Sequence, residues 1–251
     1  MSDYNPFTLV GKTILVTGAS SGIGRAISIE CSKMGATVIL TGRNEERINE
    51  SLSMLEGSGH RYFICDFDDS NAIVKLAGEV DIIDGLVNNA GFTITKPIPF
   101  INDQDLSKLL QVNTIAPILL LKELIKKKKV KREGSIVFTS SIAGILRSSI
   151  GNSMYASTKG AISAFVRVAA KELAPRGIRV NAVCPAMVDT GILVNSDISQ
   201  EQLNADRENY PLKRYGLPTD VAWATIYLLS NASNWVTGSN LVVDGGISIK
   251  K

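Results

Sequence analysis

The sequence predicts a single α/β domain, a doubly wound parallel sheet of about seven strands with helices on both faces. Three observations lead to this fold class. Short β-branched runs alternate with longer helical patterns along the chain, and the predicted strands are apolar throughout, as strands buried on both faces are. No segment rich in Pro, Gly or Ser divides the 251 residues. That length suits one large domain, which we assign to residues 1–251.

The first half of the chain contains four predicted strands and the helices between them. Residues 12–17 form a β-branched run that ends in a glycine-rich turn, and residues 25–34 follow as a helix. The further strands are residues 37–41, 61–65 and 85–87, and the helices between them are residues 45–55 and 71–78. This order is typical of β-α-β units, whose strands pair in parallel.

The second half continues the alternation with longer helices. Residues 103–128 carry an apolar stripe at helical spacing, and residues 154–173 and 219–229 are also predicted helices. Strands are predicted at residues 134–139, 179–183 and 240–243. Residues 187–215 are polar and poorly periodic, so we expect a mobile substrate lid there.

Composition excludes several classes of function. Hydrophobic residues make up 45% of the chain and charged residues 20%, which is ordinary for a globular protein. The net charge of +3 is too small to indicate a nucleic-acid partner. The basic residues between positions 126 and 132 are therefore interpreted as a solvated helix end, which complements the helix dipole.

The sequence also predicts where the protein works. Its densest apolar run, residues 115–121, is much shorter than a membrane span. Residues 1–6 lack the pattern of a signal peptide, so we expect a cytoplasmic protein. The cysteines at positions 31, 65 and 184 are widely spaced without a CxxC motif, which predicts reduced, buried thiols and no metal site.

Three glycines stand where the first strand turns into its helix: Gly18, Gly22 and Gly24. Unpaired backbone N–H groups and the positive end of the helix dipole meet at such a turn, which suits a phosphate. The spacing is GxxxGxG, and by itself a glycine-rich turn is a weak signal. The strand before it and the helix after it strengthen the prediction of a nucleotide site.

Tyr155 and Lys159 stand four residues apart in a predicted helix, so their side chains project from one face. A lysine ammonium beside a phenol favours the phenolate and lowers the pKa of the tyrosine from about 10. The pair could then exchange a proton near neutral pH. Taken alone, such a pair is more commonly a chance feature of a helix surface.

In combination, these motifs resemble those of the classical short-chain dehydrogenases/reductases over nearly the whole chain. The matching positions are residues 17–24 (TGASSGIG), Asp66, residues 88–91 (NNAG), Asn113, Ser141, Tyr155 with Lys159, residues 181–185 and residues 237–246 (TGSNLVVDGG). The tail and residues 211–222 look most similar to the β-ketoacyl-acyl carrier protein reductases and their relatives. The resemblance implies a Rossmann-type fold.

The resemblance also implies catalytic roles. Tyr155 would be the general acid for carbonyl reduction and the base in reverse, with Lys159 lowering its pKa and holding the nicotinamide ribose. Ser141 would hydrogen-bond the substrate oxygen, with Ser140 as the rival for this role. Asn113 would use a distortion of its helix to hold a water that connects Lys159 to solvent, although on its own it is typical of a helix surface.

The dinucleotide would contact the loops that follow the strands. Val188 and Thr190 would meet the nicotinamide carboxamide, and Asp66 with Phe67 would meet the adenine. The expected cofactor-binding residues are Gly18, Ser20, Ser21, Gly22, Ile23, Gly24, Arg43, Asp66, Phe67, Asn89, Ala90, Gly91, Tyr155, Lys159, Pro185, Val188 and Thr190.

Charge at the end of the second strand predicts which dinucleotide binds. An acidic residue there would repel a 2′-phosphate and favour NAD, but this chain has Gly42 followed by Arg43. An arginine fork suits a phosphate, so we expect NADP, with NADPH favoured over NADH. Alternatively, Arg43 pairs with Glu45 or Glu46.

The predicted function is hydride transfer between NADP(H) and a ketone or secondary alcohol. The alternatives are an NAD-linked dehydrogenase of a sugar, polyol or hydroxysteroid, and a dinucleotide-binding regulatory protein without turnover. The expected partner is a small carbonyl or alcohol substrate, walled in part by the apolar residues 192–194. By resemblance we expect a homotetramer with contacts through the Tyr155 helix and the C-terminal strand.

Overall fold

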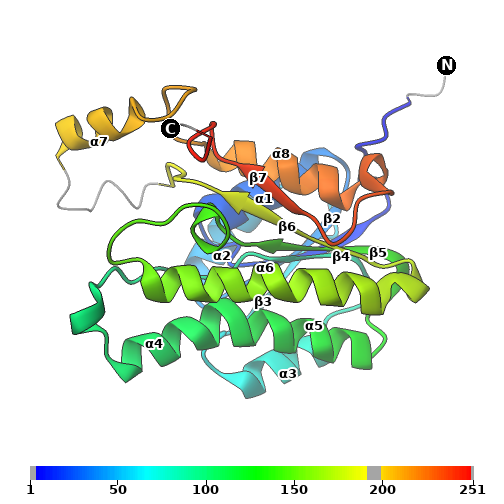
Figure 1. The fold of residues 1–251 in the computed structure, drawn as a ribbon. Helices are drawn as coiled ribbons and strands as arrows, with labels where there is room; N and C mark the ends of the chain where they lie inside the picture. The colour runs from blue at the N-terminus through cyan, green and yellow to red at the C-terminus, as the bar shows by residue number, and fades with distance from the viewer. Residues whose placement is uncertain (1–3, 191–198, 250–251) are drawn as a thin grey trace.

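The computed structural model describes residues 4–190 and 199–249. Within them, seven strands form one sheet in the order β3-β2-β1-β4-β5-β6-β7 (Figure 1). The strands are β1 (Thr13–Thr17), β2 (Thr37–Gly42), β3 (Arg61–Ile64), β4 (Ile83–Asn88), β5 (Val130–Thr139), β6 (Arg179–Pro185) and β7 (Asn240–Val243). All neighbouring strands run parallel, so the predicted fold class is confirmed.

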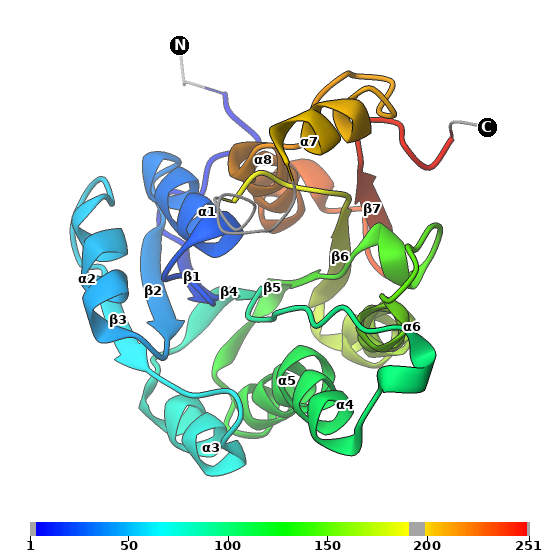
Figure 2. The ribbon, with the colours of Figure 1, turned by 90° about the vertical axis from the view of Figure 1, so that its left-hand side faces the viewer.

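Helices cover both faces of this sheet. Figure 2 shows α1, α2 and α8 on one face and α3, α5 and α6 on the other. The α-helices are α1 (Gly22–Lys33), α2 (Glu45–Ser53), α3 (Ser70–Glu79), α4 (Asp103–Leu110), α5 (Ala116–Lys126), α6 (Ser153–Leu173), α7 (Gln200–Arg207) and α8 (Pro218–Leu229). Short 3₁₀ turns occupy Ile98–Phe100, Ile142–Gly144, Ala174–Arg176 and Asn231–Ser233.

The hydrophobic core lies in two layers because successive strand residues point to opposite faces of the sheet. Leu15 of β1 packs in the layer under α3, α5 and α6, whereas Ile14 and Val16 pack in the layer under α1 and α8. All three are fully buried. Strands that are apolar on both faces are thus explained by helices on both faces.

The predicted long helix at residues 103–128 is wrong in one respect. It is interrupted by a π-helix, Gln111–Ile115, between α4 and α5. Pro117 supplies the physical reason, since it has no N–H group to donate to the Asn113 carbonyl four residues earlier. The predicted distortion at Asn113 is therefore present, and the proline was its sequence signal.

Two further expectations need correction. Residues 187–215 are not wholly irregular, because they contain α7, which begins with a capping box between Ser199 and Gln202. The expected apolar wall at residues 192–194 lies outside the described residues. β5 begins at Val130, four residues earlier than predicted, so Lys131 belongs to a strand, where it pairs with Asp84.

The remaining bulk features concern membranes and thiols. Within the described ranges, none of the helices combines the length and the apolarity that a bilayer span requires. The three cysteines are buried and unpaired. In the same part of the chain, no cluster of His, Cys, Asp and Glu side chains has the arrangement of a metal site.

Candidate active site

A cleft of about 1000 Å³ lies at the carboxyl edge of the sheet. It is lined by the segments that follow strands β1 to β6. The strand order reverses between β1 and β4, since the chain runs outward to β2 and β3 on one side and to β5, β6 and β7 on the other. Open α/β sheets bind ligands at such a switch point, and this cleft spans it.

Glycines bring the loops after β1 and β4 into direct contact beside this point. A Cβ at Gly18 would lie 2.8 Å from the Ala90 Cα, and one at Gly24 would lie 2.2 Å from the Gly18 carbonyl oxygen. Neither contact is tolerable, and Gly18 also has a positive φ of 65°. The two glycines therefore allow a close turn that leaves a cradle of bare backbone.

The N-terminus of α1 differs from those of the next helices. Its N-cap residue, Ser21, makes no side-chain hydrogen bond to the helix, and its first turn contains no acidic residue. By contrast, α2, α3 and α4 are capped by Asn44, Asp69 and Asn102. Because Ser21 lines the cleft, the N–H groups of the first turn of α1 are placed to bind an anion such as a phosphate.

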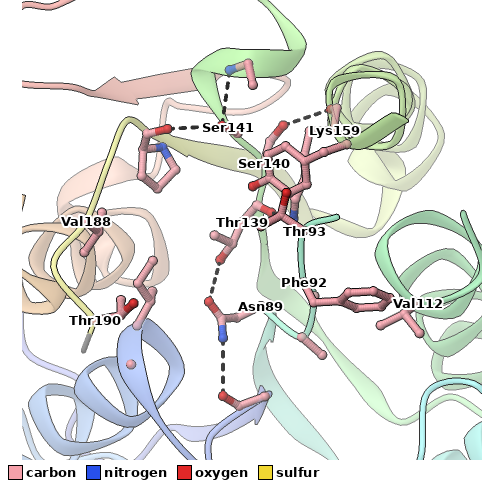
Figure 3. Close-up of a pocket in the computed structure, with 18 of the residues that line it drawn as sticks. Asn89, Phe92, Thr93, Val112, Thr139, Ser140, Ser141, Lys159, Val188 and Thr190 are labelled. Atoms are coloured by element: carbon pink, nitrogen blue, oxygen red, sulfur yellow. Dashed lines mark hydrogen bonds between the residues drawn. The ribbon is translucent and has the colours of Figure 1, made fainter. Parts of the chain in front are cut away.

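Asn89 ties three strand ends together in the floor of the cleft. Its Nδ2 donates to the Thr17 carbonyl at 3.1 Å, and its Oδ1 accepts from the Thr139 hydroxyl at 3.2 Å (Figure 3). The Thr17 hydroxyl in turn accepts from the backbone N–H groups of Asn89 and Ala90. These bonds hold β1, β4 and β5 in register at the edge where a ligand would bind.

Tyr155 and Lys159 lie on α6, on the same side of the helix. The Lys159 Nζ is 5.8 Å from the centre of the Tyr155 ring and donates to the Thr139 carbonyl at 2.7 Å. The lysine is only 5% exposed. Burial lowers the pKa of Lys159 from 10.5 to about 8, because a desolvated ammonium is costly.

The predicted lowering of the pKa of Tyr155 is not found in this geometry. Burial of the phenol raises the pKa of Tyr155, and the hydrogen bond with Ser141 only partly opposes this. The Lys159 Nζ donates to the Thr139 carbonyl and lies 5.8 Å from the centre of the Tyr155 ring, and burial of the phenol is the largest cause of the shift. Tyr155 is therefore a protonated donor at neutral pH.

The two adjacent serines have different surroundings. The Ser140 hydroxyl donates to the Lys159 carbonyl at 2.9 Å and shares a hydrogen bond with Ser163 at 2.8 Å, so it joins β5 to α6. The Ser141 hydroxyl donates to the Pro185 carbonyl at 3.3 Å and accepts from the Ala143 N–H at 3.2 Å (Figure 3). Ser141 is also close enough to the Tyr155 phenol to oppose the rise in its pKa, whereas the Ser140 hydroxyl is engaged by α6.

Asn113 lies behind the cleft wall and is 1% exposed, unlike a helix-surface asparagine. Its side chain accepts from the Phe92 N–H at 3.0 Å and donates to the Phe92 carbonyl at 2.9 Å. It also donates to the Thr158 hydroxyl at 3.2 Å. Asn113 thus joins the loop after β4 to α6, the helix of Tyr155.

One end of the cleft, where the sequence predicts adenosine to bind and which we call the adenosine end, is lined by Arg43, Asp66 and Phe67. Arg43 and Asp66 are exposed, and Phe67 is buried. Among the described residues, no carboxylate pairs with Arg43. The alternative of a pair with Glu45 is not formed, since that carboxylate accepts from the Tyr62 hydroxyl.

The opposite end of the cleft has the predicted nicotinamide contacts. Pro185, Val188 and Thr190 line it, and Figure 3 shows Val188 and Thr190 across the opening from Asn89 and Thr139. Val188 is fixed by a bridge to Gly216.

Two predicted residues, Gly24 and Asn113, do not line the cleft, whereas the others do. Both act one layer behind it, through the contacts described above. Our sequence reasoning missed Thr17 and Thr139, whose hydroxyls hold Asn89. Their position as the last residues of β1 and β5 could have indicated them, because strand ends form the ligand edge of such sheets.

Comparison with known proteins agrees with this geometry. A family model described as "Enoyl-(Acyl carrier protein) reductase" matches residues 18–248. A 3-oxoacyl-[acyl-carrier-protein] reductase of Rickettsia prowazekii is 36% identical over 239 residues, covering 95% of this chain and 98% of that protein. The chain belongs to the short-chain dehydrogenase/reductase family.

Other members of this family extend the comparison. A glucose 1-dehydrogenase of Gluconobacter oxydans is 34% identical, covering 95% of this chain and 92% of that protein. The structure of a Pseudomonas aeruginosa RhlG/NADP active-site complex superposes with a TM-score of 0.90 at 27% identity, covering 98% of this chain and all of that one.

Membership in the short-chain dehydrogenase/reductase family makes this protein an oxidoreductase that acts on CH–OH or keto groups. The family binds a nicotinamide dinucleotide. The residues present fit such a group, because the cradle at Gly18 leaves bare backbone for a pyrophosphate and the start of α1 has no side-chain cap.

Proposed function

We propose that this protein transfers a hydride between NADP(H) and a ketone or secondary alcohol, with Tyr155 as the general acid/base. One observation carries the proposal. Ser141, Tyr155 and the buried Lys159 all line the cleft at the switch point of the sheet, and the Ser141 hydroxyl lies close enough to the Tyr155 phenol to oppose the rise in its pKa.

Ser141 and Tyr155 would together hold one substrate oxygen. A nicotinamide bound in the cleft supplies or accepts the hydride. As negative charge develops on the carbonyl oxygen, Ser141 stabilises it by a hydrogen bond and Tyr155 gives it a proton. Because burial raises the pKa of Tyr155 further above neutrality, the phenol is protonated at neutral pH and can donate its proton during reduction.

Lys159 and Asn113 would return a proton to Tyr155. The pKa of Lys159, about 8, is close to neutral, so its ammonium can exchange protons under working conditions. The Asn113 carbonyl loses its α-helical donor at Pro117, which suits it to bind a water. We propose that this water connects Lys159 to solvent.

NADP is the dinucleotide that we propose. The first turn of α1 would hold the pyrophosphate, Val188 and Thr190 would hold the carboxamide, and Arg43 would bind the 2′-phosphate. Support for the last point comes from the absence, in the described part of the chain, of a carboxylate partner for Arg43. The Pseudomonas aeruginosa neighbour named above was solved with NADP.

Steady-state kinetics with both cofactors tests the proposal. A panel of ketones and keto-thioesters is assayed by consumption of NADPH and, separately, of NADH. We expect kcat/KM to be at least about tenfold higher with NADPH, which corresponds to roughly 1.4 kcal/mol of discrimination. A preference for NADH would contradict the role of Arg43, and no turnover with any carbonyl would contradict the proposed reaction.

A sugar or polyol dehydrogenase is the second candidate, and one observation favours it. The substrate end of the cleft is rich in small polar side chains: Thr93, Thr95, Ser148, Ser149 and Asn152. Such groups suit a hydroxyl-rich ligand, and one relative is named a glucose 1-dehydrogenase. Oxidation of sugars and polyols with NADP and NAD, assayed beside the ketones, distinguishes the two candidates.

We further propose that residues 187–215 act as a substrate lid. Their described part contributes Met187, Asp206 and Tyr210 to the cleft. Substrate would then protect this segment from proteolysis. Equal cleavage there with and without a saturating substrate would contradict the proposal.

A homotetramer is the assembly that we propose. β7 is an edge strand of the sheet, and open edges pair readily with a second chain. On α6, the apolar side chain of Val168 is 58% exposed in the single chain, as expected if a second subunit covers this face of the helix. A monomeric mass in light scattering would contradict this assembly.

A further inference from the structure

Arg25, in the first turn of α1, is joined to four groups on two elements. Its Nη2 donates to the Ser20 carbonyl at 2.7 Å, to the Glu50 carboxylate at 2.8 Å and to the Arg47 carbonyl at 3.3 Å. Its Nε donates to the Ser51 hydroxyl at 2.8 Å. Ser20 belongs to the glycine-rich loop, whereas the other three partners belong to α2.

These bonds couple the glycine-rich loop to α2. The Ser51 hydroxyl is itself buried and donates to the Arg47 carbonyl at 3.0 Å. Arg25 and Ser51 therefore donate to the same carbonyl, that of Arg47 in the first turn of α2. A planar guanidinium with five N–H donors can make such a set of bonds, whereas a lysine ammonium cannot reproduce its geometry.

α2 places Arg47 at the adenosine end of the cleft, in addition to Arg43, which precedes the helix. Arg47 lines the cleft together with Arg43 and Asn44. The Asn44 side chain caps the backbone N–H of Arg47 at 2.9 Å, which fixes the first turn of the helix. In the ranges that the structure covers, the side chains of Arg43 and Arg47 have neither an ion pair nor a hydrogen bond.

Two guanidinium groups that line one cleft, with no carboxylate partner in the described ranges, suit the binding of an anion. The carboxylates of the same helix turn lie outside this site: neither Glu45 nor Glu46 lines the cleft, and Glu45 accepts from the Tyr62 hydroxyl. Asp66 does line it, but it follows β3, one strand further out than β2. The cations therefore lie directly beyond β2, where the ribose 2′ position is recognised in such folds.

We propose that Arg47 binds the 2′-phosphate together with Arg43, and that Arg25 is a positioning residue that aligns this two-arginine site with the glycine-rich loop. The inference rests on the proposed use of NADP. The proposal predicts that Arg25 affects the selectivity for the 2′-phosphate, although Arg25 does not line the cleft as Arg43 and Arg47 do.

Binding of nucleotide fragments tests the inference without turnover. Dissociation constants for 2′,5′-ADP and 5′-AMP are measured by calorimetry for the wild type and for Arg47→Gln, Arg25→Gln and Arg25→Lys. We expect Arg47→Gln and Arg25→Gln each to lower the affinity for 2′,5′-ADP by about tenfold, while the affinity for 5′-AMP changes by less than about twofold. Arg25→Lys keeps the positive charge but loses the planar guanidinium, so its affinity for 2′,5′-ADP should lie between those of the wild type and Arg25→Gln.

Two controls accompany these variants. Glu50→Gln removes the ion pair of Arg25 but leaves its bonds to the Ser20 and Arg47 carbonyls, so both affinities stay within about threefold of the wild type. Arg61→Gln removes an arginine whose ion pair is with Asp81, away from the cleft lining, and changes neither affinity. Thermal unfolding reports whether each variant is folded.

The outcomes separate this inference from the proposed function. If the wild type binds 2′,5′-ADP and 5′-AMP equally, the proposed use of NADP fails. A second outcome is that the wild type binds 2′,5′-ADP more tightly than 5′-AMP while the Arg25 and Arg47 variants lose affinity for both ligands equally. That result overturns the two-arginine site but leaves the proposed use of NADP standing. Should Arg25→Gln fail to fold, the test uses Arg25→Lys and Arg47→Gln, for which the loss of affinity for 2′,5′-ADP is again compared with the loss for 5′-AMP.

Discussion

The two ends of the cleft are built in different ways. At the cofactor end, short strand-loop-helix segments place their backbone groups directly, and Thr17, Asn89 and Thr139 lock the strand ends together. At the substrate end, the walls come from segments that meet only through the tertiary fold. Arg147, for example, donates to the carbonyl of Ile247, one hundred residues away.

The kinds of contact differ accordingly. Around α7, the Tyr215 hydroxyl donates to Asp206 at 2.8 Å, and the rings of Tyr210 and Tyr215 pack edge to face. These are side-chain contacts, which a change of sequence alters easily. The cofactor end depends on strand register and bare glycine backbone, and these are common to many sequences of one fold. The nucleotide can therefore be inferred from such a chain more readily than its substrate.

Tyr155→Phe tests whether the two ends work independently. We expect kcat to fall by about 10³- to 10⁴-fold, because the proton donor is lost. The affinity for NADPH should stay within about twofold, since the phenol is only one of the many groups expected to contact the dinucleotide. Stopped-flow kinetics and cofactor titration measure the two quantities. An unchanged rate would refute the mechanism, and a parallel loss of affinity would show that the two ends are coupled.

Lys159 makes stability depend on pH at the cofactor end. Its pKa is about 8 in the folded protein and 10.5 as the ordinary value, so between these values the unfolded chain binds more protons than the folded one. The free energy of unfolding therefore rises with pH through this window, by about 3 kcal/mol in total from this group. Urea unfolding of the wild type and of Lys159→Met from pH 7 to 10.5 measures the difference. A constant difference between the two proteins would contradict the lowered pKa.

The neighbouring serines offer a matched pair at the centre of the cleft. Ser141→Ala should lower kcat by about a hundredfold, as expected for a donor to the developing oxyanion. Ser140→Ala should leave kcat within about threefold but lower the free energy of unfolding by about 1–2 kcal/mol, because it deletes buried hydrogen bonds. Equal kinetic effects would mean that Ser140 also contacts the substrate.

Stability measurements compare the two ends directly. Asn89→Ala removes the bonds that join three strand ends and should lower the free energy of unfolding by about 2 kcal/mol. Arg147→Gln, at an exposed position of the substrate end, should change it by less than about 0.5 kcal/mol while altering KM. Equal losses of stability would show that the substrate end is as rigidly built as the cofactor end.

Much of the fold could be predicted because its signals are local. Apolar strands bounded by turns, helical spacing and the glycine-rich turn depend on residues close together in the chain. The interruption at Asn113 also had a local cause in Pro117. What escaped prediction were side chains whose partners lie on other elements, such as Thr139 with Asn89 and Arg25 with α2.

By itself, the sequence determined the order of the strands and helices, the positions of the turns and the identity of the candidate proton donor. Only the tertiary structure showed that the Ser140 hydroxyl is engaged by α6, placed Asn113 behind the cleft wall and raised the pKa of Tyr155. The physical reason is that burial and hydrogen-bond partners are properties of a three-dimensional environment. Adjacent residues with the same side chain can lie in different environments, because successive residues at a strand end point in different directions.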